Sequence, residues 1–211
     1  MTLIKSISGI RGTIGGKPGD NLTPADIVKF VSGYALYISD GISGEKIKVI
    51  VGRDARISGM MVNSLVCGTL MGMGIDVIDL GLSTTPTVEI AVTEYRAQGG
   101  IIITASHNPA EWNAFKLLDS KGEFLNDSAG RKVLANADLN LPEYCKVEKL
   151  GSYKADDTFI DSTDWLFEFL ERYQKEITGY IECHRARTAR GSAQGNSPCA
   201  RARRPERKCR V

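Results

Sequence analysis

Three short apolar runs, separated by stretches with helical spacing, constrain the fold of this chain more than any other feature. The runs cover residues 47–51, 76–80 and 99–104, while residues 58–73 and 86–97 between them have the apolar spacing of amphipathic helices. Strands that alternate with helices of this length are typical of βαβ units on a mostly parallel sheet. We therefore predict an α/β fold in which a mostly parallel mixed sheet is sandwiched by helices.

Further elements are predicted on either side of this series. Residues 23–39 form a helical pattern in which Thr23 suits the N-cap and Pro24 the first helical position. Residues 115–118 resemble a short returning strand, and residues 126–137 one more helix. The predicted α/β domain then covers residues 1–150.

The last part of the chain differs in composition from this domain. Residues 139–157 are polar and indicate a linker, and an apolar stripe over about 165–177 predicts a helix. We assign residues 151–182 to the linker and opening helix of an incomplete second domain. Residues 183–211 lack the apolar residues that a core needs, which predicts a disordered basic tail.

The chain's excess of basic over acidic residues lies in that tail. Residues 183–211 hold nine Lys or Arg against one acidic residue, which leaves 18 basic and 24 acidic residues in the rest of the chain. An out-of-frame or truncated product and a natural arm for nucleic acid both fit this composition, and we favour the first because the tail interrupts a fold. A nucleic-acid partner is therefore not expected, and the pattern indicates no oligomeric state.

Composition also bears on the cellular compartment and on whether the chain spans a membrane or binds a metal. No apolar run approaches the ~18–20 residues that span a bilayer. The five cysteines are odd in number and lack a CxxC pair, so a reducing cytoplasm is expected. The two histidines form no metal-binding motif, and carboxylates do not cluster with the spacing of a cation site.

The segment GGIIITASHNPAEWNAFK contains the strongest candidate for chemistry. A buried strand ends there in Ser106, His107, Asn108 and Pro109. Ligands of open α/β sheets bind at the carboxyl ends of the strands, so Ser106 is placed to accept a group from a donor. A plain turn is the alternative, because Ser, Asn and Pro are common turn residues.

Four other residues are candidates for binding phosphate or acting near Ser106. Arg11 and Gly12 lie in a glycine-rich segment that suits phosphate binding, with a flexible N-terminus as the alternative. Arg53 follows the first strand, where a salt-bridged loop is the alternative. Lys116 would return beside Ser106 on the strand that follows, or would be a surface lysine.

In this order the motifs GIRG, VGRDARISG, LSTTPT and TASHNPAEWNAFKLLDSKGEF resemble the α-D-phosphohexomutase superfamily, closely over residues 4–130 and loosely to about 180. The family includes phosphoglucomutase, phosphomannomutase and phosphoglucosamine mutase. The resemblance implies that a hexose phosphate is the substrate and that Ser106 carries a phosphoryl group, passed through a bisphosphorylated sugar. It implies Mg²⁺ bound to the phosphate on Ser106.

The resemblance also implies roles for the other candidates. Arg11 and Lys116 would assist proton transfer and phosphate stabilisation, and His107 would join them among the catalytic residues. His107 and Asn108 would shape the loop. Substrate or phosphate binding would fall to Asn108, Gly12 and Arg53. Family members have about twice this length and an Asp-Gly-Asp-Gly-Asp metal loop, which these 211 residues lack. We therefore expect a chain that is inactive alone, with a non-catalytic sugar-phosphate or protein-binding module as the alternative.

Overall fold

A computed structural model describes most of the first 156 residues of the chain. The described residues are 1–6, 9–42, 44, 46–139 and 142–156, with the single residues 159 and 178. The chain divides into two compact units, residues 1–161 and residues 162–211, and the description below concerns the first. The predicted helix at 165–177 and the predicted basic tail at 183–211 lie outside the described residues.

A mixed sheet organises the first unit. Its seven strands within the described residues lie in the order β1-β2-β6-β5-β3-β4-β7. Four strands run parallel, namely β5 (Gly99–Ile103), β3 (Lys48–Arg53), β4 (Asp76–Leu82) and β7 (Tyr153–Ala155). The antiparallel additions are β6 (Trp112–Leu118), β2 (Gly9–Thr13) and β1 (Ile4–Ser6). The predicted mostly parallel mixed sheet is therefore confirmed.

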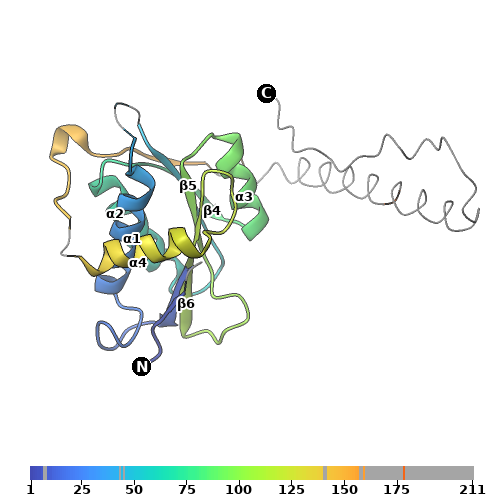
Figure 1. Ribbon diagram of the computed structural model, residues 1–211. Coiled ribbons are helices and arrows are strands. Elements are labelled where there is room, and N and C mark those ends of the chain that lie inside the picture. The colour runs from blue at the N-terminus through green and yellow to red at the C-terminus, as the bar shows by residue number, and fades with distance from the viewer. Residues whose placement is uncertain are drawn as a thin grey trace, which may run out of the picture. The chain divides into compact units, whose positions relative to one another are not determined.

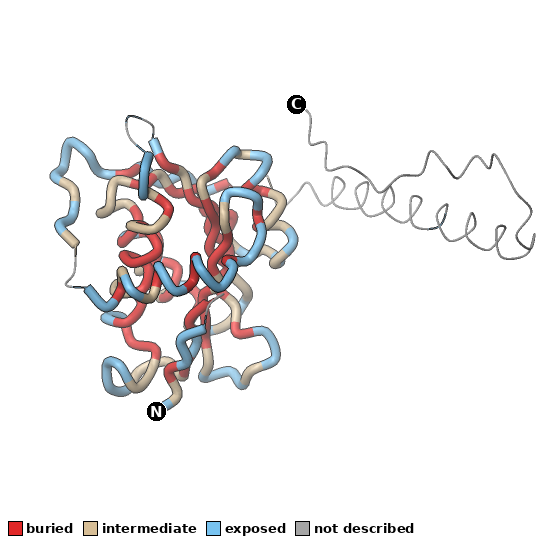
Figure 2. Tube along the Cα trace, in the orientation of Figure 1, coloured by how far each residue is buried: buried red, intermediate tan, exposed pale blue. Residues whose placement is uncertain are grey.

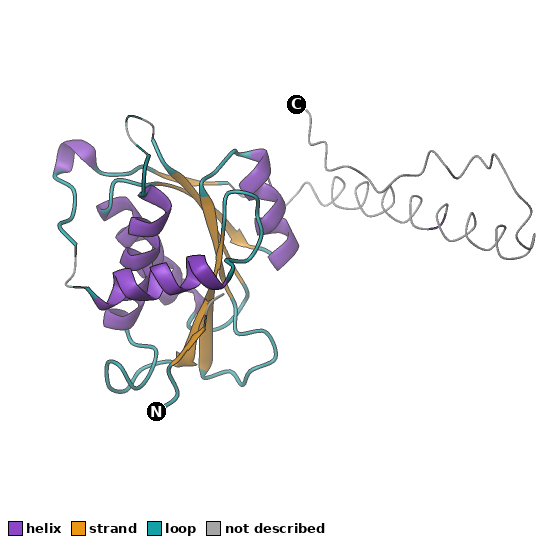
Figure 3. Cartoon of the chain, viewed as in Figure 1, coloured by secondary structure: helices purple, strands orange, loops and turns teal. Residues whose placement is uncertain are grey.

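Helices cover both faces of this sheet (Figures 1 and 3). On one face lie α1 (Pro24–Ser39), α2 (Gly59–Gly72) and α4 (Asp127–Asp138), and on the other lies α3 (Thr85–Glu94). A single 3₁₀ turn, Val147–Lys149, precedes β7 in the described part of the chain. None of the helices there combines the length and apolarity needed to span a bilayer.

Side-chain caps explain where three of the helices begin. Thr23 accepts a hydrogen bond from the Asp26 amide while Asp26 reaches back to the Thr23 amide, which completes a capping box ahead of α1. Thr84 caps α3 and Asn126 caps α4 in the same way, each through its side-chain oxygen. Each cap satisfies a backbone N–H that has no partner within the helix.

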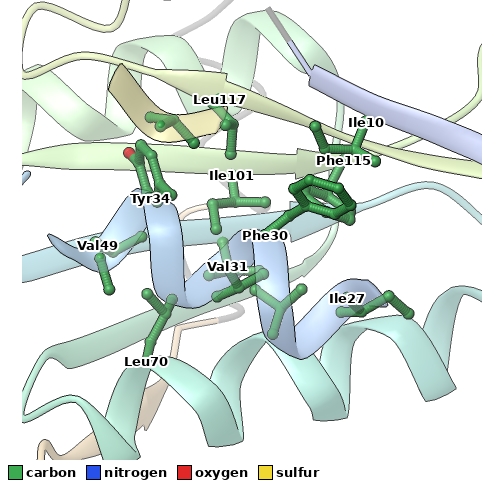
Figure 4. Close-up of a cluster of buried hydrophobic side chains, with 14 of the residues drawn as sticks. Ile10, Ile27, Phe30, Val31, Tyr34, Val49, Leu70, Ile101, Phe115 and Leu117 are labelled. Atoms are coloured by element: carbon green, nitrogen blue, oxygen red, sulfur yellow. The ribbon is translucent and has the colours of Figure 1, made fainter. Parts of the chain in front are cut away.

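The larger core lies between the sheet and α1, α2 and α4 (Figure 2). Figure 4 shows α1 residues pointing from the helix toward the strands. Tyr34 lies at the centre of this face, and its hydroxyl donates to the Leu118 carbonyl at 2.7 Å. Burial raises the Tyr34 pKa far above its ordinary value. The labelled residues of Figure 4 on the two sides are Ile27, Phe30, Val31, Tyr34, Leu70, Val49, Ile101, Phe115, Leu117 and Ile10.

A second, smaller core fills the opposite face of the sheet. Ile50 and Ile102 from the central strands pack there with Val88 and Val92 of α3. Because alternate residues of a strand face opposite sides, Ile101 and Ile103 belong to the first core and Ile102 to the second. Burial on both faces explains why residues 101–103 are an uninterrupted apolar run.

The structure differs from the sequence prediction at two places. Residues 153–155 were expected in a linker, but they form β7 and pair with β4 in parallel. The side chains of β7 are exposed, so the strand has no apolar signature, and backbone bonds such as Asp156 N–H to Asp79 O at 2.9 Å hold it. The flexible alternative for the N-terminus is wrong for residues 9–13, because β2 pairs on both sides.

Candidate functional site

The loops after β3, β4 and β5 meet at one edge of the sheet. The Ser83 amide donates to the Arg53 carbonyl at 2.9 Å, and the Asp54 amide donates to the Ile103 carbonyl at 3.0 Å. These two bonds join the ends of three neighbouring strands in register. The carboxyl edge is therefore a continuous backbone framework, and open α/β sheets bind ligands at this edge.

Ser106 lies in the loop that follows β5, where its side chain is exposed. Its φ of 54° places it in the left-handed region, which non-glycine residues seldom occupy. The Ser106 amide donates to Thr104 Oγ1 at 3.0 Å, and the Asn108 amide donates to the Ala105 carbonyl at 3.1 Å. Within the described residues, nothing forms a hydrogen bond with the Ser106 hydroxyl, so this oxygen is available to a ligand.

The two residues after Ser106 complete the tip of the loop. His107 is exposed, and Asn108 is partly buried. The Asn108 carbonyl accepts a hydrogen bond from Arg56 at 2.8 Å, so the backbone of this residue belongs to the loop framework. This hydrogen bond is consistent with the predicted role of Asn108 in shaping the loop. The same role for His107 stays a prediction.

Arg56 contacts the Ser106 loop and was not among the candidates predicted from the sequence. Its guanidinium forms an ion pair with Asp54 at 3.2 Å and donates to four backbone carbonyls of the segment that contains Ser106. The salt-bridged loop considered for residues 52–56 is therefore confirmed for Asp54 and Arg56. The motif VGRDAR placed two arginines after a strand, but the sequence gave no indication of which arginine contacts the serine loop.

Arg53 occupies the end of β3, next to this network. It is partly buried, and its Nη1 donates to the Asp54 carbonyl at 3.3 Å. Within the described residues its guanidinium forms no hydrogen bond with the Ser106 loop. Phosphate binding by Arg53 stays a prediction.

Arg11 and Gly12 lie on β2, at the antiparallel side of the sheet. Arg11 is exposed and pairs with Ala114 of β6, while Gly12 pairs with Asn113. A Cβ at Gly12 would lie 3.1 Å from the Leu22 amide nitrogen, so close packing favours glycine there. The glycine has a packing role in addition to the phosphate-binding role that the resemblance implies.

Lys116 faces the same side of the sheet as Arg11. It lies opposite Gly9 of β2 and opposite Ile102 of β5, two residues along β6 from Ala114. Ser106 follows Ile102 by four residues, and the predicted position of Lys116 beside the serine stays a prediction. Its Nζ lies 5.7 Å from the centre of the Phe124 ring, a cation–π contact.

Glu89 of α3 faces the charge of Lys116. Burial raises the pKa of the Glu89 carboxyl above its ordinary value, and the positive charge of Lys116 partly offsets that rise. Lys116 therefore belongs to a half-buried polar patch beneath the loop edge and is not a fully solvated surface lysine. In such a position the positive charge of Lys116 is screened less by salt than a fully exposed charge would be.

The described residues hold no group of three or more His, Cys, Asp or Glu side chains that would bind a metal ion. A phosphate on Ser106 would provide oxygen ligands of the kind that Mg²⁺ prefers.

Comparison with known proteins decides the family of a chain with this fold and this serine loop. The model of the phosphoglucomutase/phosphomannomutase α/β/α domain I matches residues 3–140. The chain belongs to this family. The match covers the whole sheet except β7, and it includes Ser106, Arg56 and the other candidate residues.

Relatives of this phosphoglucomutase/phosphomannomutase family member are found in bacteria and archaea. A phosphoglucosamine mutase of Alkaliphilus oremlandii is 31% identical over 169 residues, which is 78% of this chain and 36% of the relative. A phosphoglucomutase/phosphomannomutase of Thermococcus kodakarensis is 38% identical over 113 residues, 53% of this chain and 25% of the relative.

The fold is also similar to solved structures of the family. The crystal structure of a putative phosphomannomutase from Thermus thermophilus has a TM-score of 0.60 and 26% identity, over 74% of this chain and 33% of that one. The chain thus spans about a quarter to a third of the length of the proteins that it resembles.

Proposed function

We propose that this chain supplies the phosphoryl-carrying serine of a phosphohexomutase, which interconverts hexose 1- and 6-phosphates. The observation that carries the proposal is the position of Ser106. Its exposed hydroxyl lies at the carboxyl end of a central strand, in a left-handed backbone conformation that the surrounding loop imposes. Residues held in such conformations gather at functional sites, where the strain is part of the arrangement.

The proposed reaction transfers one phosphoryl group in each direction. In the first transfer, the Oγ–P bond of phosphorylated Ser106 breaks and a bond forms between phosphorus and a hydroxyl oxygen of the hexose monophosphate. The proton of that sugar hydroxyl leaves to a base while the Ser106 oxygen released from phosphorus takes up a proton, so the products are a hexose bisphosphate and the free serine hydroxyl. After the sugar turns over, its other phosphoryl group returns to Ser106, and the isomeric monophosphate leaves.

Positive charge is the main contribution that phosphoryl transfer requires from the protein. Arg11 and Lys116 share one face of the sheet and are the cations we assign to this role and to proton transfer. Arg53, at the end of β3, and Gly12 are assigned to phosphate binding, and His107 and Asn108 to the shape of the loop.

Mg²⁺ is proposed as the ion that neutralises the phosphate on Ser106. The described residues do not by themselves provide a metal site, so we assign no other ligand and derive no step through the ion. The proposed phosphate-bound Mg²⁺ would supply electrostatic stabilisation of charge on the transferring group.

We propose that the 211 residues alone do not isomerise hexose phosphates. They contain no Asp-Gly-Asp-Gly-Asp segment, which the resemblance implies as the metal loop. Relatives of this chain are named phosphoglucosamine mutase and phosphoglucomutase/phosphomannomutase, so hexose phosphates including glucosamine phosphate are the proposed substrate class. A non-catalytic sugar-phosphate-binding module is the competing function.

Transfer of a labelled phosphate separates these two functions. The chain is incubated with Mg²⁺ and a hexose bisphosphate labelled in its phosphates, separated from the sugar, and then given unlabelled hexose monophosphate. Our proposal predicts that label moves onto the chain and then back to the sugar, and that Ser106→Ala abolishes both transfers. Sugar binding without label transfer would contradict the proposal and support the binding module.

A further inference from the structure

The guanidinium of Arg56 uses every N–H that it has. An arginine side chain offers five N–H donors in a fixed plane. In this structure, each of these donors contacts an oxygen within 3.2 Å. The acceptors are Asp54 Oδ2 at 3.2 Å for Nε, the carbonyls of Pro109 at 2.7 Å and Trp112 at 3.1 Å for Nη1, and the carbonyls of Ser106 and Asn108, both at 2.8 Å, for Nη2.

A guanidinium with all its donors engaged has none left for a phosphate. Its contacts instead gather four carbonyl oxygens, from residues 106 to 112, around one charge. Carbonyl oxygens carry partial negative charge and would repel one another without a cation at the centre. We infer that Arg56 is a positioning residue that fixes the loop carrying Ser106, and that it is not a phosphate ligand.

The backbone of Ser106 needs such a constraint. A serine at φ 54° is less stable than one in the extended or helical regions, and such a conformation persists only where surrounding contacts impose it. Arg56 binds the carbonyl of Ser106 and the carbonyl of Asn108 two residues later. These two bonds hold the chain on the C-terminal side of Ser106.

Arg56 is itself anchored to the strand that leads into the loop. The Asp54 carboxylate accepts from the Arg56 amide at 3.1 Å as well as from its Nε. The Asp54 amide in turn donates to the Ile103 carbonyl at the end of β5. The end of β5 and the loop after it are therefore tied to the same short segment, which makes the position of Ser106 depend on residues 54–56.

A second link joins the same two segments farther along. The buried Asn113 side chain, at the start of β6, donates to Ser58 Oγ at 2.9 Å. Residues 54–58 thus contact both ends of the segment 103–113. Among these linking residues, only Arg56 binds the middle of the loop, within the described residues.

The importance of this positioning for catalysis rests on the proposed function, because a loop that carries a phosphoryl group must hold it in one place. The geometric part is tested without any sugar. Three amides report on the loop, those of Ser106, Asn108 and Trp112, and each donates to an acceptor inside it. Their hydrogen-exchange rates are measured by NMR in the full chain and in variants.

Arg56→Lys keeps the positive charge but offers three donors in place of five. We expect the three loop amides to exchange about tenfold faster or more in this variant, because their local opening becomes easier. Amides within β3 and β5 should keep their rates. The matched control is Arg53→Lys, whose side chain donates only to the Asp54 carbonyl within the described residues and should leave the loop amides unchanged.

Two results would overturn the inference. Loop exchange at the wild-type rate in Arg56→Lys would show that the five hydrogen bonds of the Arg56 guanidinium do not fix the loop. Equal acceleration throughout the sheet would show that Arg56 supports the whole domain and has no special effect on the loop. Neither result depends on phosphoryl transfer, so a failure here is distinct from a failure of the proposed function.

A milder variant covers the case in which Arg56→Lys does not fold. Asp54→Asn keeps Arg56 and all four carbonyl contacts but removes the ion pair. We expect it to accelerate exchange of the same three amides, by less than Arg56→Lys does. Unchanged loop exchange in Asp54→Asn, with Arg56→Lys unfolded, would also contradict the inference.

Discussion

The Nη2 atom of Arg56 lies 2.8 Å from the carbonyl oxygen of Ser106, a residue 50 positions later in the chain. The backbone that carries the Ser106 hydroxyl is therefore held in place by the Arg56 guanidinium, all of whose N–H donors are engaged in hydrogen bonds. The loop has one fixed conformation, and exposing the Ser106 hydroxyl in it requires the strained left-handed backbone of this residue.

That strain predicts a stabilising substitution at the candidate catalytic position. Ser106→Gly should raise the free energy of unfolding by about 0.5–1 kcal/mol, because glycine adopts a positive φ without steric cost, although it loses more entropy on folding. Urea denaturation monitored by circular dichroism measures the change.

The control for this prediction is Ser106→Ala. Alanine keeps the Cβ and therefore the strain, so the free energy of unfolding should change by less than about 0.5 kcal/mol. A glycine variant no more stable than the alanine variant would show that the loop does not store the expected strain.

The hydroxyl of Tyr34 predicts a loss of stability when it is removed. Tyr34→Phe should lower the free energy of unfolding by about 1–2 kcal/mol, because the Leu118 carbonyl loses a hydrogen bond inside the core. Tyr37→Phe on the same helix, where the ring is only partly buried, should change it by less than about 0.5 kcal/mol. Equal effects of the two substitutions would argue against this role for Tyr34.

Tyr153 predicts a loss of stability at high pH. Tyr153 is 49% exposed, but desolvation of its covered part, followed by its hydrogen bond to Asp79, raises the Tyr153 pKa from 10.0 to about 12. A raised pKa means that the folded state keeps the proton longer, so this contribution is complete below about pH 10 and is lost as the pH rises toward about 12. Urea denaturation at a series of pH values should show a shallower decline for Tyr153→Phe, and an unchanged slope would contradict this assignment.

The sequence predicted most of the fold because burial leaves a periodic signature. Residues 101–103 are buried on both faces and read as an apolar run, and residues 24–39 carry an apolar stripe with a capping threonine before them. β7 left no such signature, since its three side chains are exposed and its pairing with β4 uses the backbone. Pairing of that kind is independent of side-chain identity.

The candidate site was predicted in part for a related reason. Ser106 was predicted as a candidate because the chain leaves a buried strand three residues before it, which is a local feature. The partners of Arg56 are carbonyl oxygens, which every residue has, so no pattern of side chains identifies them. The position of Lys116 depends on the register between β5 and β6, which is set by the loop between them and not by the strands themselves.

Whether Ser106 carries the phosphoryl group is decided by locating the phosphate on the chain after incubation with a hexose bisphosphate. Digestion of the chain and tandem mass spectrometry assign the phosphate to one residue. We expect a single phosphate on Ser106, with Thr104 and Ser83 at the same edge unmodified. A phosphate on another hydroxyl while Ser106 stays unmodified, or an unmodified chain, would contradict the claim that Ser106 is the phosphoryl carrier.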